Sequence, residues 1–356
     1  MAEGQEQKGL RALEIAALAL VALFSVAAGV AHYAGASSIL AFSIAALALA
    51  GLAWVVSFAT EQLGQRFGPA VTGVLQSTLG NLPEFFVVIF ALAAGETVVA
   101  QASLVGSILA NALLVLGLAI AAGAARSEGG VMRFGHRLPR DAATLLLVSV
   151  FIIALIGVSV AADDRAAHHV KAISVIGALC LLAVYLTWLV PYLRSDRLES
   201  RPKARLGIIS VLLILVLAGV GAAFVSDWFV AELRPTIDRL GISAAFAGIV
   251  IVAIAGNAVE NVVGVTLAWK RQHELSISVI TNSVSQVSAF LFPVLVLCSL
   301  FFSSTLTFSL APIFIVALLL TAICIWQIMG DGEATMFEGV ALVALYVILA
   351  GVTLYD

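Results

Sequence analysis

The sequence has very little charge. Only 11% of its 356 residues are Asp, Glu, Lys or Arg, whereas 62% are hydrophobic and the mean hydropathy is +1.13. A soluble domain carries roughly 25% charged residues and roughly 45–50% apolar ones. The composition therefore excludes an ordinary soluble domain and predicts a polytopic membrane protein surrounded by lipid. With so few charges, a net charge of −3 gives no reason to expect a nucleic-acid partner.

Residues suited to disulfides, soft-metal sites or nucleophilic catalysis are also scarce. The three cysteines stand singly in apolar runs, which fits packing better than a disulfide frame or a metal site: Cys180, Cys298 and Cys324. The five histidines all fall in loops or near helix ends: His32, His136, His168, His169 and His273. No histidine or aspartate lies near the centre of an apolar segment, so an intramembrane hydrolase is not expected. We expect neither an enzyme nor a cofactor.

Long apolar runs make up most of the chain. Spanning a hydrocarbon core of about 30 Å takes about 20 mostly apolar residues. Eleven runs of this kind occur, at 11–31, 38–60, 70–94, 97–123, 141–162, 170–192, 206–229, 243–269, 275–300, 308–329 and 335–354. We therefore expect an all-α polytopic membrane protein with about 11 transmembrane helices and short connections.

The Lys and Arg residues are divided unequally between the two sides of the predicted membrane. With eleven spans, 14 of the 18 fall on the side of the N-terminus. Cytoplasmic loops of membrane proteins carry an excess of Lys and Arg. We expect a multi-pass protein whose N-terminus is cytoplasmic and whose C-terminus lies on the opposite side.

A short motif occurs twice. GNLPE at 80–84 and GNAVE at 256–260 repeat Gly, Asn and Glu at one spacing, 176 residues apart. The same offset aligns Ser107, in VGSILAN, with Ser283, in TNSVSQ. Five predicted crossings separate the copies, and because that number is odd the copies run in opposite directions. Inverted repeats with interrupted helices and midplane polar residues are typical of secondary transporters.

The repeat sets the expected domain organisation, which is two inverted five-helix repeats plus an extra N-terminal helix. The tail and extra helix occupy 1–37, and the first repeat occupies 38–193. A basic cytoplasmic linker covers 194–205, and the second, inverted repeat covers 206–356.

Glu84 and Glu260 are the two acidic residues near the centres of their segments. An ionised side chain there costs roughly 2.5–3.5 kcal/mol on insertion scales, and no Lys or Arg lies at that depth. The expected counter-charge is a cation that binds reversibly, either a metal ion or a proton. The structural alternative is a pair of protonated carboxyls hydrogen-bonded inside a helix bundle.

Oxygen-bearing side chains flank both glutamates. Asn81 shares a helical face with Glu84, as Asn257 does with Glu260, because each pair is three residues apart. The expected supporting polar shell is Gln101, Ser103, Ser107, Asn111, Asn282, Ser283 and Gln286. Carboxylate, amide, hydroxyl and carbonyl oxygens together suit Ca²⁺. The serine stripes alone fit close helix packing equally well.

Pro83 predicts a break in the first copy. Proline removes a backbone donor and clashes with the carbonyl four residues earlier, that of Leu79. Beside Gly80, it should kink or unwind the segment and free carbonyls that could face the ion. The second copy has Gly256 but no proline, so it has less reason to break.

These motifs resemble the two α-repeats of Ca²⁺/H⁺ antiporters of the cation exchanger type, within the Ca²⁺/cation antiporter superfamily. The resemblance rests on GNLPE, GNAVE, QASLVGSILAN (101–111), NSVSQ (282–286) and SFATEQLGQRFGP (57–69), and it covers about 38–354. It implies a metal site in which Glu84 and Glu260 bind Ca²⁺. Main-chain carbonyls near Gly80 and Gly256 would help, with Asn81 and Asn257 nearby. It also implies alternating access, by sliding of the helices at 38–60 and 206–229 across a rigid bundle.

The chain departs from the family pattern in two places. The linker is basic, where many members carry an acidic helix thought to sense Ca²⁺. Asn261 stands where the family often has His, so the resemblance does not support a proton relay there.

The predicted function is exchange of cytoplasmic Ca²⁺ for external protons. Deprotonated glutamates bind Ca²⁺ and protonated ones release it, because metal ligands must shed their protons. The alternatives are a Na⁺/Ca²⁺ exchanger, a Mn²⁺ or broader divalent cation/H⁺ antiporter, and a channel. The expected partners are Ca²⁺, H⁺ and membrane lipid, and self-association into a homo-oligomer is left open.

Overall fold

The computed structural model describes residues 9–64, 66, 75, 78–194 and 205–355. The N-terminal tail, the first part of the segment expected at 70–94 and nearly all of the basic linker lie outside the described residues. Part of the SFATEQLGQRFGP stretch lies outside them as well.

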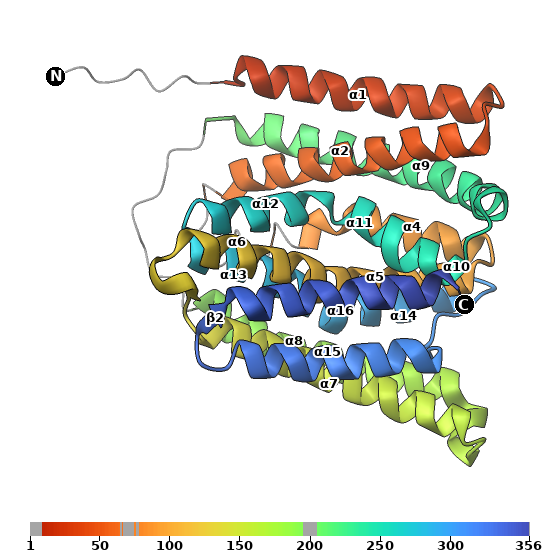
Figure 1. Cartoon of the computed structure of the whole chain (residues 1–356). Helices are drawn as coiled ribbons and strands as arrows, with labels where there is room; N and C mark the ends of the chain where they lie inside the picture. The colour runs from red at the N-terminus through yellow and green to blue at the C-terminus, as the bar shows by residue number, and fades with distance from the viewer. Residues whose placement is uncertain (1–8, 65, 67–74, 76–77, 195–204, 356) are drawn as a thin grey trace. The chain divides into compact units, whose positions relative to one another are not determined.

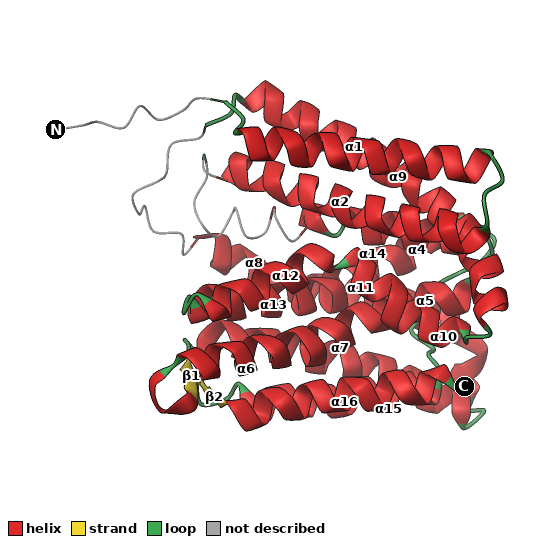
Figure 2. Ribbon diagram, turned by 45° about the horizontal axis from the view of Figure 1, so that its top comes forward, coloured by secondary structure: helices red, strands yellow, loops and turns green. Residues whose placement is uncertain are grey.

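The described chain is almost entirely helical (Figures 1 and 2). The first half contains α1 (Ala12–Tyr33), α2 (Ser38–Gly64), α4 (Leu82–Ala93), α5 (Thr97–Leu109), the π-helix η1 (Ala110–Val115), α6 (Leu116–Arg126), α7 (Arg137–Ala161) and α8 (Val170–Arg194). The second half contains α9 (Ile208–Leu240), α10 (Ala244–Phe246), the π-helix η4 (Ala247–Val252), α11 (Ala253–Gly256), α12 (Ala258–Trp269), α13 (His273–Gln286), the π-helix η5 (Val287–Leu291), α14 (Phe292–Cys298), α15 (Pro312–Ile328) and α16 (Met336–Leu354). Short 3-10 helices are η2 (Glu128–Gly130), η3 (Arg165–His169) and η6 (Ser299–Phe301).

The lengths and hydropathies of these helices identify an integral, multi-pass membrane protein. Within the described residues, eight helical stretches are long and apolar enough to cross a membrane, or nine if the bent pair Ala244–Gly256 and Ala258–Trp269 is one span. Two shorter apolar helices, Leu82–Ala93 and Pro312–Ile328, lie in two further segments that the sequence predicts to span.

A two-stranded ribbon departs from the expected all-α fold. Strand β1 (Val131–Arg133) pairs antiparallel with β2 (Glu333–Thr335), and Val131 lies opposite Thr335. An ion pair of 2.8 Å between Arg133 Nε and Glu333 Oε1 extends this pairing. The ribbon ties the connection after α6 to the connection before α16.

The chain divides into two compact units. The first unit is Met1–Val87 with Leu189–Thr236, and it holds α1, α2, the start of α4 and most of α9. The second unit is Val88–Trp188 with Ile237–Asp356.

In the first unit, α1 packs along α2, and side chains of both helices contact α9 (Figure 1). The rings of Phe42 in α2 and Phe229 in α9 stack at 4.5 Å. A buried cluster of Phe58, Ala59 and Leu63 from the end of α2 packs with Leu206 and Val211 at the start of α9. Apolar contacts therefore join α2 to α9 at two separated levels.

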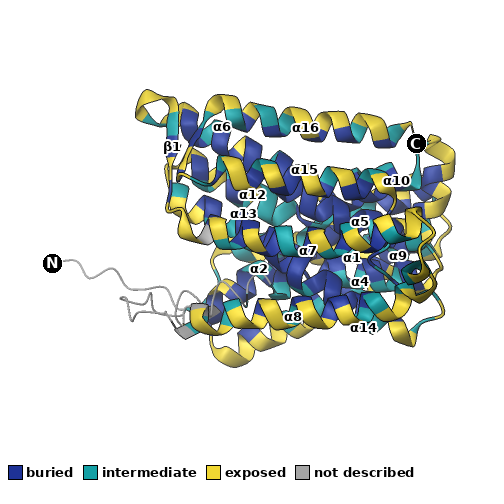
Figure 3. Ribbon diagram, turned by 90° about the horizontal axis from the view of Figure 1, so that it is seen from below, coloured by how far each residue is buried: buried dark blue, intermediate teal, exposed yellow. Residues whose placement is uncertain are grey.

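In the second unit, the stretch from α5 to α6 forms the interior and the outer helices face the surroundings (Figure 3). In Thr97–Arg126, 83% of the most apolar 18-residue segment is buried, whereas the same share for α16 is 28%. Helix α16 packs on α6, α15 on α7, and α12 on both α6 and α13. The exposed side chains of α16 are largely apolar, as a lipid-facing surface requires.

Candidate functional site

Both copies of the repeated motif pass through a helix break at the asparagine. Asn81 forms a turn between helical residues 78–80 and α4, and Asn257 separates α11 from α12, where the axis bends by 65°. The carbonyl of each asparagine accepts the first hydrogen bond of the new helix. Phe85 donates to Asn81 at 2.9 Å, and Asn261 donates to Asn257 at 3.0 Å.

The second break forms without a proline, although the absence of one made a break there less expected. In the first copy, Pro83 is the second residue of α4, inside the first turn, where proline's missing N–H would be unpaired anyway. Both copies instead share a Gly–Asn pair directly before the new helix. Glycine weakens a helix interior, and the asparagine side chain competes for backbone groups.

Each break places a glutamate in the first turn of the helix that follows. Glu84 and Glu260 are the third residues of α4 and α12. Unpaired N–H groups give a helix N-terminus a partial positive charge, which favours a carboxylate there. Glu84, in the first unit, is buried, and Glu260, in the second unit, is half-buried. Gly80 and Gly256 end the preceding helices, where carbonyls lack an intrahelical donor.

A hydrogen-bond network surrounds the second break. The Nδ2 of Asn257 donates to Ser107 Oγ at 2.6 Å and to the Ala253 carbonyl at 2.9 Å. The Nδ2 of Asn111 donates to Asn257 Oδ1 and to Ser283 Oγ, both at 3.1 Å. We call Ser107, Asn111, Asn257 and Ser283 the asparagine network. All four are buried and come from α5, η1, the break itself and α13.

Two glycines let α5 approach the segment before the break. A Cβ on Gly106 would overlap the Cα of Ile249, and one on Gly248 would lie 2.5 Å from the Cβ of Ala102. The crossing seats α5 against η4 at backbone contact and brings Ser107 to Asn257. The hydroxyl of Tyr346, in α16, donates to the Ile249 carbonyl at 3.2 Å. Tyr346 could not be identified from the sequence, because nothing in its apolar surroundings indicates its hydrogen-bond partner.

Several buried oxygens near this network have no hydrogen-bond partner among the described residues. They are Asn111 Oδ1, Gln286 Oε1, Ser103 Oγ and Asn261 Oδ1. Leaving a polar group unpaired in an apolar interior costs free energy, so such groups normally bind water or an ion. These neutral hard oxygens suit Ca²⁺ better than a soft metal. Within the described residues, no three His, Cys, Asp or Glu side chains gather as a metal cluster.

Two residues of the expected shell hydrogen-bond elsewhere. The amide of Gln101 donates to the carbonyls of Ser309 at 2.9 Å and Thr307 at 3.4 Å, in the segment before α15. The amide of Asn282 lies 3.4 Å from Ser278 Oγ on its own helix. Asn81 is buried, like Asn257.

Three π-helices lie close to the motif residues. Asn111 is the second residue of η1, η5 starts directly after Gln286, and η4 leads directly into α11. Single π-turns inside α-helices are frequent at functional sites. These π-helices could not be predicted from the sequence, because their Ala, Val and Leu residues do not distinguish them from ordinary α-helix.

Comparisons with known proteins extend these observations to the whole chain. Residues 37–192 and 210–355 match the family described as sodium/calcium exchanger protein. The chain is 31% identical over 347 residues to the Ca(2+)/H(+) antiporter of Synechocystis sp., which covers 90% of this chain and 92% of that protein. It is 30% identical over 321 residues to the Ca(2+)/H(+) antiporter ChaA of Bacillus subtilis, covering 87% of this chain and 90% of that protein.

A solved structure shows the same fold. Native YfkE superposes with a TM-score of 0.81 at 26% sequence identity, covering 96% of this chain and 100% of that one. The family match takes in both motif copies and most of the chain. This chain therefore belongs to the sodium/calcium exchanger protein family.

Proposed function

We propose that this protein is a secondary transporter that exchanges cytoplasmic Ca²⁺ for external protons. The observation that carries the proposal is the repeated geometry of the two motifs, in which a helix breaks at Asn and restarts with Glu in its first turn. The relatives named Ca(2+)/H(+) antiporter support the choice of ions, because they align over nearly the whole chain.

In this proposal Glu84 and Glu260 are the carboxylates that bind either Ca²⁺ or protons. Carbonyls near Gly80 and Gly256, with Asn81 and Asn257, complete the metal ligands. The unpaired oxygens of Asn111, Gln286 and Ser103 support a polar shell around Glu260 within the second unit.

Competition between the two cations is sufficient for exchange. An ionised carboxylate attracts Ca²⁺, whereas a protonated one is neutral and loses most of its affinity for the metal. Acidity on the external side therefore drives Ca²⁺ release there. Two carboxylates set a ceiling of about two protons per Ca²⁺ for direct competition.

The proposed architecture is eleven spans, arranged as two inverted five-helix repeats with α1 as an extra helix. Its support is threefold: the family match falls into two segments, the breaks recur at Asn81 and Asn257, and π-turns recur at η1 and η5. The bias of 14 in 18 Lys and Arg supports a cytoplasmic N-terminus and a C-terminus outside. That α2 and most of α9 belong to one unit supports their joint movement in alternating access.

Ion flux in reconstituted vesicles tests the function. We expect Ca²⁺ uptake to follow an imposed pH gradient and to ignore a Na⁺ gradient. Glu84→Gln and Glu260→Gln should each lower it at least about tenfold, because a neutral amide cannot exchange a proton for the metal. A parallel measurement with Mn²⁺ shows how broad the selectivity is.

Three other results would overturn the proposal. Uptake driven by Na⁺ and indifferent to pH identifies a Na⁺/Ca²⁺ exchanger, the alternative that the family description also covers. Rapid flux that dissipates the Ca²⁺ gradient without counter-transport identifies a channel. Wild-type rates in both glutamine variants would remove the two glutamates from the mechanism.

A further inference from the structure

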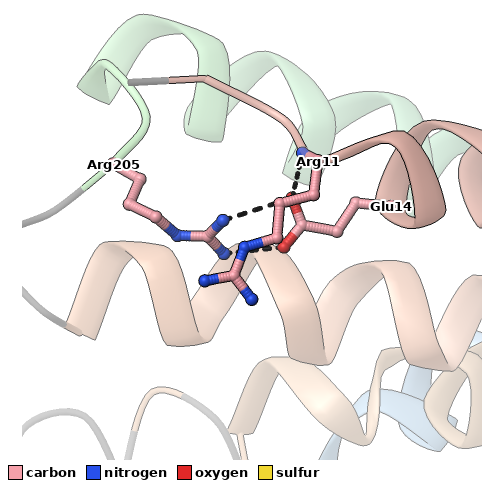
Figure 4. Close-up of polar contacts among 3 residues, drawn as sticks. All are labelled: Arg11, Glu14 and Arg205. Carbon is pink, nitrogen blue, oxygen red and sulfur yellow. Dashed lines mark hydrogen bonds and ion pairs between the residues drawn. The ribbon is translucent and has the colours of Figure 1, made fainter. Parts of the chain in front are cut away.

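Helix α1 is tied to the start of α9 by a sheltered ion pair (Figure 4). Arg205, just before α9, places Nη2 2.7 Å from Glu14 Oε1 and Nη1 3.5 Å from Glu14 Oε2. The same carboxylate accepts the backbone N–H of Arg11 at 2.7 Å, at the cap of α1. The side chains of Arg205 and Glu14 are only 22% and 14% exposed.

The other end of α1 is tied to α9 as well. Nδ1 of His32 lies 3.0 Å from Glu232 Oε1, and these side chains are 26% and 17% exposed. One α9 turn earlier, the Trp228 ring sits against Gly29, where an added Cβ would lie 2.8 Å from the ring. The ring of Tyr33 meets Trp228 edge-on, with centroids 6.0 Å apart.

Between these two ends, α1 packs on α2, and α2 packs on α9. Val21 of α1 fits at Gly51 of α2, where an added Cβ would lie 2.7 Å from Val21 Cγ2. Leu52 of α2 lies over Gly221 of α9, 3.2 Å from the position of an added Cβ. The three helices therefore contact one another pairwise inside the first unit.

These contacts fix the axial position of α1. Apolar burial alone gives little association between helices in lipid, so packing and polar contacts must supply it. Most of the large apolar side chains of α1 are exposed, including Leu13 at 85% and Leu23 at 63%, so the helix is otherwise a lipid-facing surface. Sliding α1 along α9 by one turn, about 5.4 Å, would break both polar pairs at once.

We propose that α1 is a strap that makes α2 and α9 move as one body during exchange, with Glu14–Arg205 and His32–Glu232 as its positioning contacts. This inference rests on the proposed function, in which α2 and α9 move between the two access states. It assigns a role in transport to a helix that lies outside both repeats and contributes no residue to the proposed ion site.

Cross-linking tests whether α1 and α9 move together. Cys180, Cys298 and Cys324 are first replaced by Ala, and His32→Cys with Glu232→Cys is then joined by a short bifunctional thiol reagent. Because these positions keep their distance in a rigid body and the cross-link replaces the lost His32–Glu232 contact, the cross-linked protein should transport Ca²⁺ at least as fast as the same variant before linking. Loss of transport on cross-linking, recovered on cleaving the reagent, would overturn the strap.

Removing the contacts tests whether the strap matters. The Glu14→Gln and Glu232→Gln double variant should lose about tenfold in maximum rate while its half-saturating Ca²⁺ concentration stays unchanged, because the strap acts on the conformational step and not on binding. Glu128→Gln, at an exposed carboxylate in η2, is the matched control. The exchanged pair Glu14→Arg with Arg205→Glu should recover most of the rate that Glu14→Gln alone loses. Wild-type rates in the double variant, or no recovery by the exchanged pair, would overturn the proposal.

A distance measurement keeps the strap and the transport function separate. Spin labels at Leu23→Cys in α1 and Leu217→Cys in α9, both exposed positions, report one distance. We expect the same distance in Ca²⁺ at high pH and without Ca²⁺ at low pH. A shift between the two conditions overturns the strap whichever ions are transported, whereas absent pH-driven uptake in the wild type refutes the proposed function.

Discussion

At the scale of single residues, Asn257 is the centre of the described site. Its Nδ2 uses both hydrogens, on Ser107 and on the Ala253 carbonyl, while its Oδ1 accepts from Asn111. These three contacts hold the break in place, and the second lone pair of Oδ1 stays available for a bound ion. Among the described residues, the nearby oxygens of Asn111, Gln286, Ser103 and Asn261 have no hydrogen-bond partner.

Replacing Asn257 by Ala should destabilise the folded protein by about 1–2 kcal/mol, because three hydrogen bonds are lost within a membrane protein's interior. Thermal unfolding of the purified protein measures this. Asn282→Ala is the matched control, since its amide makes only a 3.4 Å contact on its own helix. Equal melting temperatures for the two variants would show that the asparagine network does not stabilise the break.

The sequence could predict some of these residues and not others. The spacing of the motif identifies Asn257, Ser107 and Ser283, because an internal repeat is visible without a structure. The partner of Gln101 could not be predicted, because the carbonyls it binds lie more than 200 positions away and carry no side-chain signature.

At the scale of the helices, the break follows the Gly–Asn pair and not the proline. Pro83→Ala should therefore retain the break and transport Ca²⁺ within about twofold of the wild type, since a proline in a first helical turn replaces no intrahelical hydrogen bond. Vesicle uptake checks this directly. A loss comparable to that of Glu84→Gln would show that the first break depends on its proline.

The close crossing of α5 and η4 leaves no room for a side chain at Gly106. Gly106→Ala should destabilise the protein by about 3 kcal/mol or more, because its methyl group would overlap the Ile249 backbone. Gly219→Ala is the control: nothing lies within 4 Å of its added Cβ, and replacing a helical glycine there should stabilise by up to about 1 kcal/mol. Equal yields of folded protein from both variants would contradict the crossing.

Helix positions were largely predictable, and local departures from α-helix were not. Most of the expected segments overlap described helices, because apolar length is visible directly in the sequence. The first part of 70–94 lies outside the described residues, and α9 continues to Leu240, beyond the expected end at 229. The π-helices depend on how neighbouring helices pack, and the residues of η4, AGIVIV, differ in no evident way from an ordinary apolar turn.

At the scale of the whole molecule, composition determines the class of protein and the charge bias predicts its orientation. In a cysteine-free background, Asp164→Cys should react with a membrane-impermeant maleimide added to intact cells, whereas Glu128→Cys should react only after lysis. Both positions are exposed in connections between helices. The reverse pattern of labelling would invert the proposed topology.

Contacts between distant segments mark the limit of sequence reasoning at this scale. Glu14 pairs with a residue 191 positions away, and His32 with one 200 positions away. Each has an ordinary alternative interpretation as a charge near a membrane surface. Only the folded arrangement of α1, α2 and α9 shows that Glu14 and His32 each contact a residue of the α9 region.

The proposed exchange depends on displacement of protons from Glu84 and Glu260 by Ca²⁺. Calorimetric titration of the purified protein with Ca²⁺, repeated in buffers of different ionisation enthalpy at a pH where the glutamates are protonated, counts the protons released. We expect the wild type to release about two protons for each Ca²⁺ bound. A glutamine variant that still binds Ca²⁺ should release about one. Ca²⁺ binding that releases no protons, or the same release in Glu84→Gln and Glu260→Gln as in the wild type, would contradict it.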